Sequence, residues 1–331
     1  MDQIMPSIAA VPTEQPSRSA PPLGVEVEGL AKRYGEVEAV RGISFCIEEG
    51  EIFGLLGPNG AGKTTTLSML STLLRPSRGD ARIFGKSLAG DVAGVRRLVG
   101  LVPQDISLYP TLSARQNLSF FGRIYGVTRQ ALRARAEQLL DLVDLRGRAD
   151  EPVDTYSGGM MRRLNLACGL IHAPRLLLLD EPTVGVDPES RQHILSAIRE
   201  LAKDGMAVLY TTHYMEEAEH FCDRIAIMDQ GHIAATGTLP ELLSIVGMGE
   251  LIELDWVPDD VYRARLQAVR GVTRIETTAG LTRIFVANAG RTLGPIAAVL
   301  AECSGAVEGL RVHRVNLERV FLHLTGKARR D

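Results

Sequence analysis

One eight-residue stretch constrains the fold of this chain more than any other feature of its sequence. It matches the pattern G-x-x-x-x-G-K-[ST], in which glycines let backbone N–H groups turn inward around phosphate oxygens. The lysine of the pattern adds a positive charge, and the hydroxyl after it can ligate Mg²⁺. The eight residues are Gly57, Pro58, Asn59, Gly60, Ala61, Gly62, Lys63 and Thr64.

The flanks of this loop have the pattern that phosphate binding requires. Residues 51–56 form a short apolar run that predicts a buried strand, and residues 63–74 predict a helix that ends before Pro76. A glycine-rich loop between a strand and a helix points its bare N–H groups at an anion. We therefore predict a nucleotide-binding protein.

Composition limits the partners of the chain. Its 331 residues are long enough for two domains, and charged residues make up 23% with a formal net charge of −3. That balance gives no electrostatic reason to expect nucleic acid as a partner. The four cysteines are widely spaced and lack a C-x-x-C arrangement, which indicates free thiols in a reducing compartment.

The sequence predicts no membrane insertion of its own. No apolar run approaches the roughly 20 residues that span a bilayer. The first residues lack the basic segment and the unbroken apolar core of a signal peptide. We expect a cytosolic chain, so that another subunit would supply any membrane span.

The pattern along the chain divides it into three parts. Residues 1–23 contain five prolines and predict a disordered lead. Residues 24–246 alternate between strand and helix patterns, apart from a helical insert at about 110–170. Residues 247–331 predict the order β-α-β-β-α-β, with a final helix over 317–324. The expected fold is an α/β phosphate-loop domain with a mixed sheet, followed by a small α+β accessory domain.

Two adjacent acids follow the most apolar strand of the sequence. Four leucines at 176–179 end in Asp180 and Glu181, which suits a central parallel strand buried on both faces. Asp180 would reach Mg²⁺ on the phosphate loop, and Glu181 would polarise a water for attack on a γ-phosphate. The alternative is an ordinary strand end with two solvated acids.

A second candidate anion site lies at Ser157, Gly158 and Gly159. A serine at a helix N-cap followed by two glycines leaves backbone N–H groups unpaired, and the helix dipole favours negative charge there. Taken by itself, the same tripeptide is more typical of a flexible turn.

Together these motifs resemble those of the ATP-binding cassette ATPases over about residues 25–240. Residues 156–160 are similar to the cassette signature, with Tyr156 and Met160 in place of the commoner leucine and glutamine, a difference that concerns the subfamily. Residues 316–326 resemble the tail of export cassettes that work with a separate ABC-2-type permease.

The resemblance implies roles for four more residues. Gln104 resembles the glutamine that senses Mg²⁺ and the membrane partner, and His213 resembles the switch histidine at the γ-phosphate. Asp187 resembles the loop that crosses to a second cassette, although it also suits a helix cap, and Tyr34 resembles the aromatic residue that stacks on adenine. The implied catalytic residues are Glu181, His213, Gln104 and Lys63; the implied nucleotide contacts are Tyr34, Gly57, Pro58, Asn59, Gly60, Ala61, Gly62, Lys63, Thr64, Thr65, Ser157, Gly158, Gly159 and Asp187; the implied metal ligands are Thr64, Gln104 and Asp180.

The function that the resemblance implies is ATP hydrolysis coupled to membrane export. The cofactors would be ATP and Mg²⁺, and the partners a second copy of the chain and a polytopic permease, with the subunit peripheral on the cytoplasmic face of the membrane. The alternative is a soluble cassette protein acting on ribosomes or DNA. Such proteins usually carry two cassettes or long coiled-coil inserts, whereas this chain has one phosphate loop and no sustained heptads. Cargo is selected mainly in the permease, so antibiotic, lipid and oligosaccharide all remain open.

Overall fold

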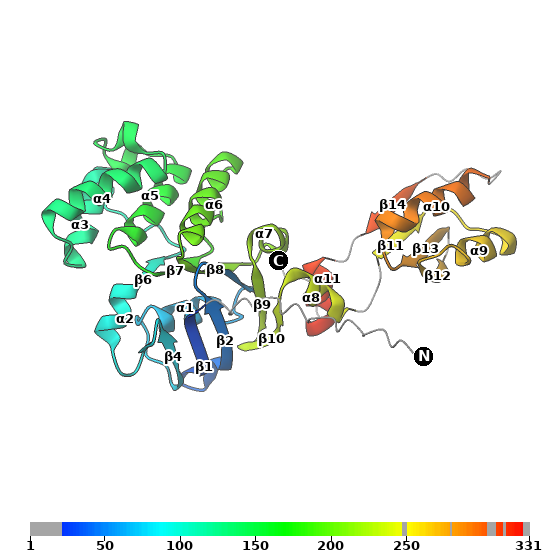
Figure 1. The fold of residues 1–331 in the computed structure, drawn as a ribbon, viewed down its shortest axis with the longest axis horizontal. Coiled ribbons are helices and arrows are strands. Elements are labelled where there is room, and N and C mark those ends of the chain that lie inside the picture. Colours follow the sequence, from blue (N-terminus) through cyan, green and yellow to red (C-terminus); the bar gives the residue numbers. More distant parts are fainter. Residues whose placement is uncertain (1–21, 247–249, 279, 303–308, 314–315, 327–331) are drawn as a thin grey trace, which may run out of the picture.

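The computed structural model describes residues 22–246, 250–278, 280–302, 309–313 and 316–326. Figure 1 shows a larger domain and a smaller one. Residues 1–21 of the expected disordered lead lie outside the described residues, and Leu23 already begins strand β1 (Leu23–Tyr34).

A six-stranded sheet forms the centre of the larger domain. Its order is β10-β9-β3-β8-β7-β6. All neighbours pair in parallel except the edge strand β10, which is antiparallel to β9. The carboxyl ends of the parallel strands therefore meet along one edge, where open α/β sheets bind ligands. The strands are β3 (Ile52–Leu56), β6 (Val99–Val102), β7 (Leu176–Asp180), β8 (Ala207–Thr212), β9 (Arg224–Asp229) and β10 (His232–Gly237).

An antiparallel sheet of order β2-β1-β4-β5 packs against this centre. Val25 and Ile47 of the antiparallel sheet share a buried core with Phe53 of β3 and Leu67 of helix α1. Strands β1 and β2 pair with several register shifts, which let long strands bend while they remain paired. The elements are β2 (Val37–Glu48), β4 (Arg78–Ile83), β5 (Lys86–Ser87), α1 (Lys63–Leu70) and α2 (Val92–Leu98).

The predicted helical insert is present at the β6–β7 side of the sheet. Leu118, Leu139 and Leu166 pack in one core with Val102 and Leu179 of the sheet. The first insert helix begins with a complete capping box, in which Ser113 and Gln116 satisfy each other's backbone N–H groups. The helices are α3 (Ala114–Ile124), α4 (Arg129–Leu142), α5 (Gly158–Leu170) and α6 (Pro188–Lys203), with short 3₁₀ turns at Arg146–Arg148 and Val153–Thr155.

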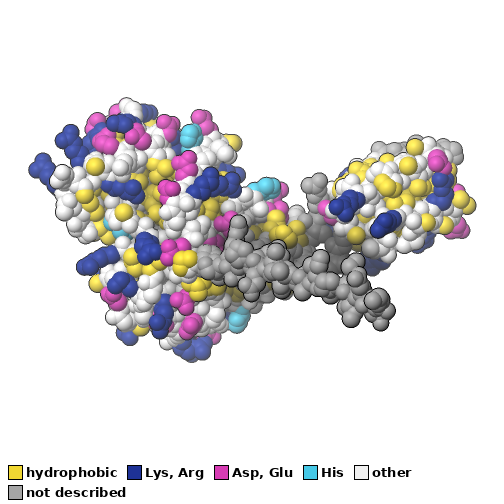
Figure 2. All heavy atoms as spheres, in the orientation of Figure 1, with side chains coloured by type: hydrophobic (Ala, Val, Ile, Leu, Met, Phe, Trp, Pro, Cys, Tyr) yellow, Lys and Arg dark blue, Asp and Glu magenta, His cyan; other side chains and the backbone are white. Residues whose placement is uncertain are grey.

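The accessory domain has the predicted β-α-β-β-α-β order. Its strands form an antiparallel sheet of order β12-β13-β11-β14, and Ile252, Ile284 and Ile296 lie in its buried core. Figure 2 shows hydrophobic side chains gathered over this domain where Figure 1 places α10. The elements are β11 (Glu250–Leu254), α9 (Asp260–Gln267), β12 (Val272–Thr278), β13 (Leu281–Val286), α10 (Ala289–Ala301) and β14 (Leu310–His313).

The last helix, α11 (Leu317–Thr325), packs on the larger domain. Leu317, Val320 and Phe321 share a core with residues of α7 (Met215–Phe221) and α8 (Leu239–Ile245). The expected assignment of all of 247–331 to the accessory domain therefore needs a correction for this helix. The apolar face of a helix can be read from sequence, but the surface that covers it cannot. Among the described residues no helix is both long enough and apolar enough to cross a membrane.

Replacing Phe321 with alanine should destabilise the larger domain by about 3–5 kcal/mol, the cost of truncating a buried aromatic side chain. Phe321 is 4% exposed. Chemical denaturation measures the free energy of unfolding, and His323→Ala on the exposed side of the same helix is the control. Equal unfolding free energies for the two variants would contradict the packing of α11 on this domain.

Candidate functional site

The glycine-rich loop lies between β3 and α1, and two of its glycines are required by close packing. A Cβ atom on Gly57 would lie 2.2 Å from the carbonyl oxygen of Met228. Gly62 has a φ of 111°, and a Cβ there would lie 2.7 Å from the carbonyl oxygen of Ala39. Because Gly62 is the N-cap of α1 and has no side chain, the first-turn N–H groups of α1 remain available to an anion.

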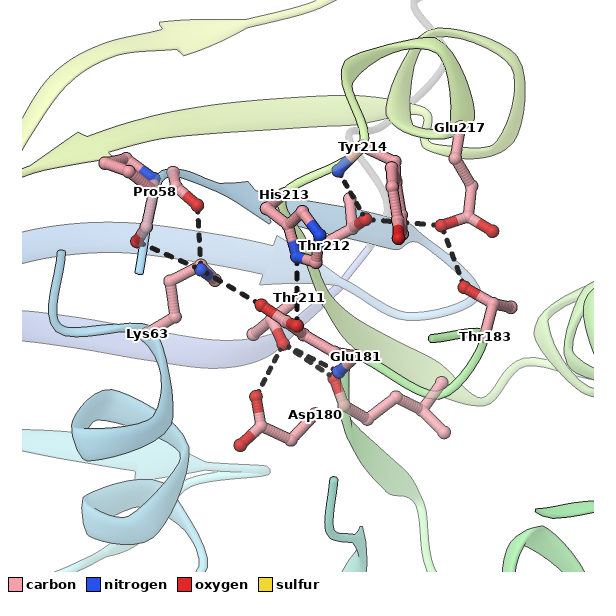
Figure 3. A network of polar contacts seen from close by, with 12 residues as sticks. Pro58, Lys63, Asp180, Glu181, Thr183, Thr211, Thr212, His213, Tyr214 and Glu217 are labelled. Atoms are coloured by element: carbon pink, nitrogen blue, oxygen red, sulfur yellow. Dashed lines mark hydrogen bonds and ion pairs between the residues drawn. The ribbon is translucent and has the colours of Figure 1, made fainter. Parts of the chain in front are cut away.

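The Lys63 side chain points back into the loop. Its Nζ donates hydrogen bonds to the carbonyl oxygens of Gly57 at 2.7 Å and Pro58 at 3.2 Å. The same ammonium lies 3.2 Å from Oε1 of Glu181, and both side chains are almost fully buried. Figure 3 shows this lysine between the loop and the acids that follow β7. Thr64 and Thr65 follow in the first turn of α1, and Thr64 is exposed.

The two predicted acids are held by a threonine from the neighbouring strand. The Thr211 hydroxyl accepts a hydrogen bond from the Glu181 N–H at 3.1 Å and donates one to Oδ1 of Asp180 at 2.8 Å. Both acids are buried, so the alternative of a solvated strand end is wrong. Glu181 has a φ of 47°, a left-handed conformation that costs a non-glycine residue about 1–3 kcal/mol and must be held by its surroundings.

His213 completes the group. Its Nδ1 lies 3.0 Å from Oε2 of Glu181. The Glu181 carboxylate thus has Lys63 at one oxygen and His213 at the other. The structure brings these three residues together from the carboxyl ends of β3, β7 and β8, three adjacent strands of the sheet.

Two other predicted site residues lie away from this group. Gln104 is exposed two residues beyond β6, and its carbonyl oxygen accepts a hydrogen bond from Arg162 of α5. Tyr34 ends β1 with 48% of its surface exposed, and the Lys32 ammonium lies 5.4 Å from its ring centre. The described residues show no hydrogen bond from either side chain to the phosphate loop.

The predicted serine cap is present at the start of α5. The Ser157 hydroxyl accepts a hydrogen bond from the Met160 N–H at 3.2 Å. Gly158 is exposed with open space around it, whereas a Cβ on Gly159 would lie 2.1 Å from the Ser190 hydroxyl. Gly159 is therefore required by packing between α5 and α6, and Gly158 faces outward.

Asp187 caps the neighbouring helix α6, which is one of the two roles that the sequence analysis gave for this residue. Its Oδ1 accepts a hydrogen bond from the Ser190 N–H at 2.9 Å, and this bond lowers the pKa of the Asp187 carboxyl below its usual value. Ser157 and Asp187 thus begin two helices that meet where Gly159 lies against Ser190.

Sequence analysis missed four polar residues that support the group: Thr183, Thr211, Thr212 and Glu217. Glu217 accepts hydrogen bonds from the hydroxyls of Thr183 and Thr212. Threonines in a strand and an acid in the first turns of a helix are so common that neither pattern indicated a role. Their contacts appear only when β7, β8 and α7 are brought together.

Comparison with known proteins places the chain among transporter ATP-binding proteins. The ABC transporter family model matches residues 40–184. The chain is 43% identical to the linearmycin resistance ATP-binding protein LnrL of Bacillus subtilis, over 93% of this chain and 100% of that protein. It is 42% identical to the Nod factor export ATP-binding protein I of Ralstonia nicotianae, over 93% of this chain and 95% of that protein.

Solved structures agree with these relatives. The ATP-binding subunit of an ABC transporter superposes with a TM-score of 0.62 at 30% identity, covering 67% of this chain and 93% of that one. The dimeric structure of MJ0796, a bacterial ABC transporter cassette, superposes with a TM-score of 0.59 at 27% identity, covering 65% and 98% respectively.

Replacing Lys63 with alanine should destabilise the protein at pH 7 by about 3 kcal/mol, because it leaves the buried Glu181 carboxylate without its cation. Adding Glu181→Gln should restore part of this loss by removing the buried charge. Thermal unfolding without nucleotide measures both effects. The control is Lys86→Ala, which breaks a half-exposed pair with Asp91 and should lower the unfolding temperature far less, because ion pairs at the surface contribute little to stability. If the double variant is less stable than Lys63→Ala alone, the buried pair is not the source of the loss.

Proposed function

The chain belongs to the ABC transporter family of ATP-binding proteins, and from this premise we propose that it is the ATP-hydrolysing subunit of a membrane exporter. The observation that carries the proposal is the Glu181 carboxylate held between the Lys63 ammonium and the His213 ring. Relatives that match it along nearly their whole length are named for antibiotic resistance or for Nod factor export. Their names support the exporter over an ATPase acting on ribosomes or DNA.

The proposed roles of Lys63, Glu181 and His213 in hydrolysis depend on which groups the Lys63 ammonium contacts. This ammonium faces Glu181 and two loop carbonyls. A bound nucleotide offers phosphate oxygens to the same ammonium and to the bare N–H groups of α1. Glu181 then exchanges its lysine partner for a water, from which it accepts a proton as general base. His213 contacts the second carboxylate oxygen, and its proposed role is to steady the γ-phosphate.

The proposed metal ligands are chemically suited to Mg²⁺. Thr64 offers a hydroxyl, Asp180 a carboxylate and Gln104 an amide oxygen, and Mg²⁺ prefers oxygen ligands together with substrate phosphates. The Thr211 hydroxyl fixes the orientation of Asp180. When bound, Mg²⁺ would neutralise negative charge that develops on the phosphates during hydrolysis. Tyr34, with its half-exposed ring, is the proposed stacking surface for the adenine.

The proposed partners are a separate ABC-2-type permease and a second copy of this chain. A dimeric cassette among the similar solved structures supports the second copy. The exposed start of α5 at Ser157 and Gly158 would then meet the γ-phosphate bound by the other copy, beside the Asp187 loop. Figure 2 shows positive and negative side chains interspersed on the face that it draws, which supports a protein partner over nucleic acid. The subunit would lie peripherally on the cytoplasmic face of the membrane.

Glu181→Gln should keep ATP affinity and lose turnover by about 10²–10⁴, because the nearly isosteric amide cannot accept a proton. Phosphate release measures turnover, and titration with a fluorescent ATP analogue measures binding. The control is Glu216→Gln on the exposed side of α7. Turnover unchanged in Glu181→Gln would remove this residue from the mechanism.

The shared site can be tested at Gly158. In the Glu181→Gln background, ATP should trap a dimer, and adding Gly158→Asp should abolish it because the new carboxylate would face the partner's γ-phosphate. Gly158 is a cleaner position than Gly159, where any side chain would collide with Ser190 inside the same chain. Gly147→Asp, at another exposed glycine with open space around it, should leave the dimer intact. Size-exclusion chromatography with ATP compares the two glycine variants. A dimer that persists with Gly158→Asp would contradict a site shared between two copies of the chain.

A further inference from the structure

We propose that Glu217 is a positioning residue for hydrolysis, an inference that rests on the proposed role of Glu181 as general base. Its carboxylate joins the turn that follows Glu181 to the strand end that carries His213. The distance between the base and the histidine is then set by a side chain that contacts neither the nucleotide nor the water.

The geometry of this junction is visible in Figure 3. Oε2 of Glu217 accepts a hydrogen bond from the Thr183 hydroxyl at 3.0 Å and another from the Thr212 hydroxyl at 3.2 Å. Both threonines are 1% exposed, so no bulk water replaces these bonds. Thr183 stands two residues after Glu181, and Thr212 stands immediately before His213.

The directions of the hydrogen bonds converge on Glu217. Thr183 donates its hydroxyl proton to Glu217, and the Tyr210 hydroxyl lies 3.1 Å from the Thr183 oxygen. Burial raises the pKa of Tyr210 well above its usual value, which keeps the Tyr210 hydroxyl protonated. The Thr212 hydroxyl accepts a hydrogen bond from the Tyr214 N–H at 2.9 Å and donates its own hydrogen bond to Glu217.

The two oxygens of the Glu217 carboxylate differ in their hydrogen bonds. Oε1 is buried and has no hydrogen-bond partner within the described part of the chain. The hydrogen bonds that hold this carboxylate therefore go to the two threonine hydroxyls. A buried carboxylate with one unpartnered oxygen carries a stability cost, which is typical of a group retained for its function.

The backbone at Glu181 explains why such an anchor is needed. Its φ of 47° is strained, and the turn that follows is closed by a long bond of 3.3 Å from the Val184 N–H to the Glu181 oxygen. Thr211 holds this residue from the preceding side through the Glu181 N–H. Thr183 and Glu217 hold it from the following side, so that the strained conformation is fixed at both ends.

The test compares removal of the Glu217 carboxylate with its conservative replacement. Glu217→Ala should lower kcat by about 10–100-fold through misplacement of the base, with ATP affinity changed by less than about threefold. Glu217→Gln keeps a carbonyl oxygen that both threonine hydroxyls can reach, so it should recover most of kcat. Glu216→Ala, which removes an exposed acid one position earlier, should leave kcat unchanged.

Thr183→Val and Thr212→Val remove one hydroxyl each and keep the shape, so they serve even if Glu217→Ala fails to fold. Each should lower kcat at constant ATP affinity, and the loss in the Thr183→Val/Thr212→Val double variant should be smaller than the product of the two single losses, because either change alone breaks the link through Glu217. An increased KM with unchanged kcat, or a Glu217→Gln as slow as Glu217→Ala, would overturn the proposal.

The same measurements separate this proposal from the proposed function. If Glu181→Gln itself turns over normally, the role of Glu181 as general base is wrong. If only the Glu217 and threonine variants behave as wild type, the positioning role of Glu217 alone is wrong.

Discussion

The buried contact between the Lys63 ammonium and the Glu181 carboxylate is the interaction on which the rest of the site depends. A charge taken out of water must find a partner, and here a cation from the loop after β3 meets an anion from the end of β7. This requirement fixes the distance between two strand ends that β8 separates in the sheet. Thr211 of β8 and His213, which directly follows this strand, lie between the two strand ends and contact the acids. The candidate site is thus assembled at one sheet edge by three elements that are far apart in the sequence.

The parts of the fold that sequence predicted are those in which the information is local. The phosphate loop carries its glycines at fixed spacing, and Gly57 and Gly62 are required by neighbours that any side chain would strike. The leucine run before Asp180 is a fully buried parallel strand, and Ser157 and Asp187 cap helices through bonds within three residues. The β-α-β-β-α-β order of the accessory domain also follows from periodicity along the chain. Each of these features depends on neighbours within a few residues or on one repeating pattern.

What sequence could not predict depends on contacts between distant segments. Helix α11 has a clear apolar face, but the pattern does not say that α7 and α8 cover it. The short elements α2, β10 and α8 were not predicted because a few residues give too little periodicity. Glu217 looked like any acid at the start of a helix, and only the meeting of β7, β8 and α7 puts Thr183 and Thr212 on its carboxylate. Gly158 and Gly159 look alike in sequence, yet Ser190 from α6 makes them structurally different.

Helix α7 contacts both the residues around Glu181 and helix α11. On one side its Glu217 holds the turn after Glu181 and the strand end before His213. On the other side its Glu219 accepts a hydrogen bond from the Leu317 N–H at the start of α11, and its Ala218 lies in the core that α11 closes. Glu217 and Glu219 are two residues apart, so a shift of α7 by the length of a hydrogen bond would change both sets of contacts together. The segment after the accessory domain is therefore packed against the same short helix that carries Glu217. Burial of α11 contributes to the stability of the larger domain and to the placement of α7.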